Sequence, residues 1–148
     1  MAEPPSPDHL RLSMEELNQF FGDAFGANDE LSAGVVEMEP GRVLVRRPSS
    51  LLGLRPGNVI SGPTMMSLAD MAVYALVLGH IGIVPMAVTT SLTIHFLRPA
   101  KPGHLFGEAR LLRLGRRIAT AEVRLWSEAP NRIAAHATVA YAIPDGVS

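Results

Sequence analysis

The chain has 148 residues, of which 47% are hydrophobic and 18% carry a charge. This length favours a single domain with a sizeable core, and this composition excludes an intrinsically disordered chain. The net charge of −1 gives no overall attraction to nucleic acid, and the lack of cysteine excludes disulfide bonds, thiolate zinc sites and thiol nucleophiles. The acidic, proline-rich start is unlike a signal peptide, so we expect a cytoplasmic protein.

The first 25 residues predict a tail and a helix. Residues 1–10 are expected to be a flexible tail in front of one domain over residues 11–148. A helix is predicted over residues 12–25, because Ser13 can cap it and Glu16 stands three positions later, as in a capping box. Its apolar residues recur at helical spacing on one face.

A second helix is predicted over residues 64–78, which are apolar on almost every side. Ser61 or Gly62 can serve as its N-cap, and the helix is expected to end near Gly79 or Gly82. A helix of this kind is buried on most sides.

One charge interrupts this apolar region. Between residues 56 and 97, Asp70 is the only aspartate, glutamate, lysine or arginine. A buried carboxylate is costly unless it is paired or takes part in chemistry, so Asp70 is a candidate functional residue. The best candidate for a membrane span, residues 71–88, is interrupted by His80 and Pro85 and is shorter than a bilayer requires, so we expect no membrane insertion.

Six strands are predicted on the two sides of the central helix, at residues 32–39, 42–48, 87–99, 104–114, 118–127 and 133–144. Residues 49–60 are expected to be a loop. The short connections between the last four strands indicate an antiparallel meander, and the apolar central helix requires a curved sheet for its cover. Because Leu, Val, Ile and Ala occur on both faces of the strands, we expect a homodimer or a tetramer formed by two dimers.

Three segments, SGPTMMSLAD, VTTSLTIHFLRPA and LLRLGRRIATAEV, resemble the PaaI-type acyl-CoA thioesterases in their order and spacing. The resemblance extends over residues 30–143. It implies the hotdog fold, an α+β arrangement in which a curved antiparallel sheet wraps a long central helix, here with an additional N-terminal helix. It also implies an acyl-CoA substrate and no cofactor.

The resemblance assigns roles to two residues and has three departures. Asp70 matches the catalytic acid of the family's Leu-Ala-Asp element, and Gly62 matches the first glycine of its His-Gly-Gly motif, whose backbone N–H meets the thioester carbonyl. Ser61 replaces the histidine of that motif, and Pro63, which has no N–H to offer, replaces its second glycine. Tyr74 stands one turn after the acid, where many members have a small or hydroxyl residue.

Thioester hydrolysis needs a polarised carbonyl and an activated nucleophile. The N–H groups at a helix N-terminus stabilise an oxyanion, which makes Gly62 the first candidate donor and Thr64 the second. Asp70 can act as a general base toward water or attack the carbonyl itself. Eight residues of helix separate Gly62 from Asp70 by about 12 Å, which predicts that Gly62 of one subunit works with Asp70 of its neighbour.

Other polar residues near this region are candidates for substrate binding. Ser61 can be a helix cap, a hydrogen-bond partner of the substrate or, without support from a nucleophile-elbow motif, a nucleophile. Ser67, three residues before Asp70, and Tyr74, four residues after it, can each hydrogen-bond its carboxylate. Tyr74 can instead line the acyl pocket.

Phosphates of CoA attract arginine and lysine, and the candidates to bind them are Arg98, Lys101, Arg116 and Arg117. The histidines have no ligand spacing, so no metal is expected. The sequence thus predicts an acyl-CoA thioesterase acting on a small aryl- or acyl-CoA. A non-catalytic acyl-CoA binding module is the alternative, and a hotdog dehydratase is third because it needs a histidine near the acid.

Overall fold

The computed structural model describes residues 3–26, 34–48 and 53–145. Two helices and eight strands follow one another in this order: α1 (Met14–Phe25), β1 (Gly34–Glu39), β2 (Arg42–Arg47), β3 (Leu54–Arg55), β4 (Val59–Ile60), α2 (Gly62–Ile81), β5 (Val88–Phe96), β6 (Leu105–Leu114), β7 (Ile118–Trp126) and β8 (Ala135–Ala142).

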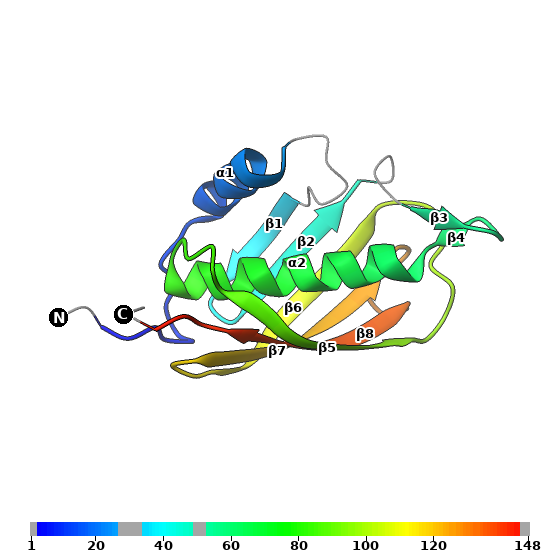
Figure 1. Ribbon diagram of the computed structural model, residues 1–148. Coiled ribbons are helices and arrows are strands. Elements are labelled where there is room, and N and C mark those ends of the chain that lie inside the picture. The colour runs from blue at the N-terminus through cyan, green and yellow to red at the C-terminus, as the bar shows by residue number, and fades with distance from the viewer. Residues whose placement is uncertain (1–2, 27–33, 49–52, 146–148) are drawn as a thin grey trace.

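Six of the strands form one antiparallel sheet in the order β1-β2-β6-β7-β8-β5. The sheet curves around α2, and α1 lies beside β1, at the edge of the sheet opposite β5 (Figure 1). The expected α+β arrangement of a long central helix, a wrapped antiparallel sheet and an N-terminal helix is therefore confirmed. The loop predicted over residues 49–60 is wrong in part, because β3 and β4 pair as a two-stranded sheet there. Residues 49–52, like the first two residues of the strand predicted at 32–39, lie outside the described residues.

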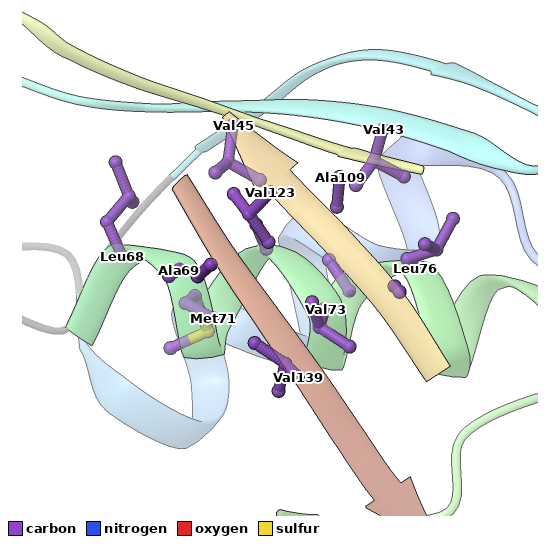
Figure 2. Close-up of a cluster of buried hydrophobic side chains, with 14 of the residues drawn as sticks. Val43, Val45, Leu68, Ala69, Met71, Val73, Leu76, Ala109, Val123 and Val139 are labelled. Atoms are coloured by element: carbon purple, nitrogen blue, oxygen red, sulfur yellow. The ribbon is translucent and has the colours of Figure 1, made fainter. Parts of the chain in front are cut away.

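α2 is the centre of the core. Its side chains Leu68, Val73 and Leu76 are fully buried. Figure 2 shows them among side chains of the sheet, including Val45 and Val123. By length and composition α2 could cross a membrane, but 72% of its apolar window is buried inside this domain, as in the core helix of a globular protein.

The N-terminal helix is fixed by local signals and by packing. Ser13 and Glu16 form the predicted capping box, each side chain accepting from the backbone N–H of the other residue. Asn18 fastens the helix to β1, because its amide donates to the carbonyl of Val35 at 3.0 Å and accepts from the N–H of Val35 at 2.9 Å. Phe21, a residue of α1, is buried against the core.

The outer face of the sheet differs from the expectation of apolar residues on both faces. Ion pairs occupy much of it. Arg42 of β2 contacts Glu108 of β6 at 2.8 Å, and His136 of β8 contacts Glu122 of β7 at 3.3 Å; within β6, Arg110 contacts Glu108 at 3.3 Å. A surface of this charge is satisfied in water, so it gives no argument for an oligomer.

His80, near the end of α2, anchors two segments from elsewhere in the chain. It is fully buried, and its Nε2 accepts from the N–H of Gly41 at 3.1 Å. Its Nδ1–H faces the carbonyl oxygens of Ser6 at 2.9 Å and His9 at 3.0 Å. The second half of the segment expected to be a tail thus contacts α2. Only the neutral ring can accept from Gly41 and donate to the carbonyls together.

Burial lowers the pKa of His80, so stability should depend on pH below neutrality. The unfolded chain binds a proton near the usual pKa of about 6.5, whereas the folded chain resists it until lower pH. The contribution of His80 is therefore complete above about pH 6.5 and is lost as pH falls.

We predict that the urea midpoint falls more for wild type than for His80→Gln between about pH 7.5 and about pH 5, because glutamine does not titrate. Other titrating groups are common to both proteins and cancel in this comparison. Equal falls would contradict the role given to the neutral ring.

Candidate active site

Asp70 lies on the one strip of α2 that the domain leaves uncovered. The residues of α2 that keep some exposure recur at helical spacing, namely Pro63, Met66, Ser67, Asp70 and Tyr74, with Gly62 and Thr64 at the helix start. This strip runs beside β5, an edge strand of the sheet. The lone charge of the apolar helix is thus on its accessible side.

Two hydroxyl groups hold the Asp70 carboxylate. Its Oδ1 accepts from Thr89 Oγ1 at 2.6 Å and from the Tyr141 hydroxyl at 2.8 Å. Thr89 comes from β5 and Tyr141 from β8, where the two residues are opposite each other in the strand pairing. Within residues 3–26, 34–48 and 53–145, no cation pairs with this carboxylate. The anion is therefore stabilised by neutral donors, which leaves its charge available to a substrate.

A pocket of about 450 Å³ opens beside this carboxylate. Its lining is largely apolar and comprises Phe25, Ser67, Asp70, Met71, Tyr74, Ala87, Val88, Thr89 and Tyr141. The rings of Tyr74 and Tyr141 are stacked with centroids 5.8 Å apart and planes 19° apart. An apolar cavity of this size with one carboxylate in its wall has the character of a small-molecule site.

The start of α2 offers backbone N–H groups instead of a carboxylate. Ser61 is the N-cap, and its Oγ accepts from the N–H of Thr64 at 3.3 Å. The N–H of Thr64, the second predicted oxyanion donor, is therefore engaged by the cap in this arrangement, and its role toward a substrate stays a prediction. The N–H of Gly62 has no hydrogen-bond partner in the described part of the chain, and the ring of Phe96 lies against the glycine, 3.2 Å from where a Cβ would stand.

Gly62 and Asp70 belong to different cavities of one chain. Gly62 lines a cavity of about 560 Å³, together with Pro63, Phe96 and Arg98. Asp70 lines the pocket described above and an adjoining hollow of about 520 Å³. The expected separation of two helical turns is thus present, and none of these three cavities holds both groups.

Ser67 and Tyr74 do not hydrogen-bond Asp70, and that expectation was wrong for both. Ser67 Oγ accepts from Arg47 Nη2 at 3.3 Å, and the Tyr74 hydroxyl donates to the carbonyl of Pro85 at 3.2 Å. Burial raises the pKa of Tyr74, so its phenol remains a donor. Both side chains line the 450 Å³ pocket, which agrees with the other interpretation of Tyr74 as a wall of the acyl pocket.

The basic candidates lie at two ends of the sheet. Arg98 follows β5 and lies in the cavity of Gly62. Arg116 and Arg117 lie in the turn between β6 and β7, where Arg117 pairs with Asp145 at 3.2 Å on the surface. Lys101 pairs with Glu128 at 3.4 Å, also on the surface. One chain therefore does not bring these cations to one point.

Sequence reasoning missed Thr89 and Tyr141. Strand alternation predicts that Tyr141 points toward the helix, but it places Thr89 on the opposite face of β5, with Ser91 and Thr93. The irregularity of β5 between Thr89 and Ser91, together with its register against β8, brings Thr89 to Asp70. No histidine contacts Asp70 within the described residues, which disfavours the dehydratase alternative. In the same part of the chain, no three histidine or acidic residues are grouped to hold a metal ion.

We predict that Ser61→Ala lowers the free energy of unfolding by about 1 kcal/mol, because the cap of α2 is lost. Ser61→Asn, which retains a side-chain acceptor suited to an N-cap, should lose much less. Urea denaturation of the two variants measures the difference. Equal stability of Ser61→Ala and wild type would show that the cap contributes nothing.

A family model and a solved structure both relate this chain to thioesterases. The model of the thioesterase superfamily matches residues 57–134, a range that includes Gly62 and Asp70. A solved structure from Silicibacter sp. TM1040, of a protein proposed to be a thioesterase, is 34% identical to this chain. That match covers 94% of this chain and 96% of the other, with a TM-score of 0.83. No curated protein gives a significant match.

More distant structures share the fold. Zebra fish thioesterase superfamily member 2 is 21% identical, with 90% of this chain and 99% of that chain covered and a TM-score of 0.76. The E. coli PaaI protein from the phenylacetic acid degradation operon is also 21% identical, with 88% and 92% covered and a TM-score of 0.66. With the family model over more than half of its length and the hotdog arrangement of its helices and sheet, this chain belongs to the thioesterase superfamily of thioester hydrolases.

Proposed function

We propose that the protein is an acyl-CoA thioesterase that hydrolyses a small aryl- or acyl-CoA to the free acid and CoA, with Asp70 as the catalytic carboxylate. The observation that carries this proposal is the position of Asp70, the only charge of the apolar helix, in the wall of the 450 Å³ pocket. The largely apolar, aromatic lining suits the acyl group, and the cysteine-free chain suits a cytoplasmic enzyme.

The carboxylate can act in two ways. As a general base, Asp70 takes a proton from water while the water oxygen bonds to the carbonyl carbon, the C–S bond breaks and the CoA thiolate leaves. As a nucleophile, an Asp70 oxygen forms a mixed anhydride as the thiolate leaves, and water then hydrolyses the anhydride. In both routes negative charge develops on the carbonyl oxygen.

Gly62 of a second subunit is the proposed donor to that oxygen. Its N–H is open in the described part of the chain and lies at the positive end of the α2 dipole. The dimer is supported by the free edge of β5 and by exposed apolar side chains along the α2 strip and the end of β5: Met66 is 41% exposed, Phe96 is 50% and Leu97 is 55%. A tetramer formed by two such dimers fits the same chain.

The proposed two-subunit site also gives a reason for the placement of the basic residues. Arg98 shares a cavity with Gly62. Arg116 and Arg117 come directly after β6, whose end pairs with Ala119 of β7. Ala119 pairs in turn with Tyr141, which lies beside Asp70, so the arginine turn is at the Asp70 end of the sheet. A site built from Gly62 of one subunit and Asp70 of the other therefore draws Arg98 from the first and the arginine turn from the second. We assign these three arginines, with Lys101, to the phosphates of CoA.

We predict that Asp70→Asn lowers kcat by about 10²–10⁴-fold, because an amide is neither a base nor an adequate nucleophile. Release of free CoA thiol from a panel of aryl- and alkyl-CoA thioesters measures the loss. Asp23→Asn is the matched control, since Asp23 is on the surface of α1 and, among the described residues, hydrogen-bonds only Gln19. Turnover by Asp70→Asn equal to that of the control would refute the assignment.

We predict that the double variant Arg116→Ala, Arg117→Ala raises KM for acyl-CoA about tenfold with little change in kcat, since the phosphates lie far from the reacting bond. Arg132→Ala, which removes another surface arginine in a salt bridge, is the control. If KM is the same in both variants, the arginine turn does not bind CoA.

A non-catalytic acyl-CoA binding module is the second candidate. It is favoured by Pro63, which has no N–H to offer a carbonyl. It is also favoured by Ser61, which replaces the histidine of the family's motif and whose side chain is used to cap the helix. The thiol-release measurement separates the two candidates, because a binding module retains acyl-CoA without releasing thiol from any member of the panel.

A further inference from the structure

The two oxygens of the Asp70 carboxylate are not equivalent. Oδ1 accepts two hydrogen bonds, from Thr89 at 2.6 Å and from Tyr141 at 2.8 Å. Oδ2 accepts none from the residues that the structure describes. One oxygen is therefore fixed by the protein, and the other is available to a substrate carbonyl or a water molecule.

We propose that Tyr141 is a positioning residue that holds Asp70 by Oδ1 and so presents Oδ2 to the reacting atoms. This inference rests on the catalytic role proposed for Asp70. Tyr141 itself does not need to touch the thioester: it acts by restricting the orientation of the carboxylate.

The surroundings of Tyr141 suit it to this task. Its side chain is 3% exposed and points from β8 toward α2. Its ring stacks on Tyr74, whose own hydroxyl is tied to the carbonyl of Pro85 at 3.2 Å. The Tyr141 hydroxyl also lies 3.2 Å from the backbone carbonyl of Asp70, so it contacts the main chain and the side chain of the same residue.

Tyr141 remains a donor under all conditions in which a thioester is assayed. Burial, and next the charge of Asp70, raise the pKa of its phenol well above the usual value. Thr89, the other donor, is an exposed residue on an edge strand, where its hydroxyl can also turn to solvent. Of the two donors to Oδ1, Tyr141 is therefore the one that the fold holds in place.

Tyr141→Phe tests the proposal, because it keeps the buried ring and its stacking and removes only the hydroxyl. We expect kcat to fall about tenfold or more and KM to change less than about twofold. Thr90→Val is the control, since it removes a hydroxyl of β5 that bonds Ala140 at 3.2 Å.

A second measurement does not depend on turnover. The ¹³C NMR signal of the Asp70 carboxyl carbon should shift in Tyr141→Phe, because the carboxylate loses a hydrogen-bond donor, and should stay unchanged in Thr90→Val. An Asp70 carboxyl signal at the same chemical shift in Tyr141→Phe and wild type would overturn the proposal. It would equally be overturned by a lower kcat accompanied by a lower melting temperature and an unmoved carboxyl signal, which is the signature of a structural role alone.

The test separates this proposal from the proposed function. If Asp70→Asn abolishes turnover while Tyr141→Phe keeps both the kcat and the Asp70 carboxyl signal of wild type, Asp70 remains the catalytic carboxylate and only the positioning role of Tyr141 fails. If Asp70→Asn retains turnover, the proposed function of Asp70 fails, and the carboxyl signal still decides whether Tyr141 holds the carboxylate.

Discussion

The fold depends on burying a helix that has almost no polar side. The sheet must curve around α2 because a flat sheet covers one side of such a helix only, and α1 and the segment anchored by His80 cover more of it. Among the described residues of α2, one strip keeps some exposure, running from Pro63 through Asp70 to Tyr74. The strip faces the free edge region of β5, so one uncovered surface contains both the lone carboxylate and the apolar side chains suited to a second subunit.

This arrangement explains how the chain tolerates Asp70. A carboxylate in a largely apolar wall is costly unless its oxygens are hydrogen-bonded. Thr89 and Tyr141 satisfy one oxygen from two adjacent strands, without a cation that would neutralise the charge. The helix that requires the sheet for its burial therefore also receives from that sheet the two hydroxyls that make its carboxylate tolerable and fix its direction.

Patterns within single segments predicted most of the fold. Periodicity located both helices and all six strands of the large sheet, and Ser13 and Ser61 were recognisable caps because capping depends on residues three positions apart. The isolation of Asp70 in a long apolar region also marked it without any structure. The partners of Asp70 could not be predicted in this way, since helical spacing indicated Ser67 and Tyr74. Arg47 and Pro85 compete for those two side chains, and the register of β5 on β8 brings Thr89 and Tyr141 instead.

The central claim is that Asp70 of one subunit completes a site begun by Gly62 of another, and subunit mixing tests it most directly. Gly62→Pro removes the N–H at the first helical position, and Ser61 before it is already extended, as proline requires. The ring of Phe96, 3.2 Å from where a Cβ would stand, has to shift slightly to admit the proline. This variant and Asp70→Asn should each be inactive alone. After denaturation and refolding together, a shared site predicts recovery of about a quarter of wild-type turnover, because half of the dimers are mixed and each has one intact site. No recovery in mixed dimers would contradict a shared site and place both groups within one subunit.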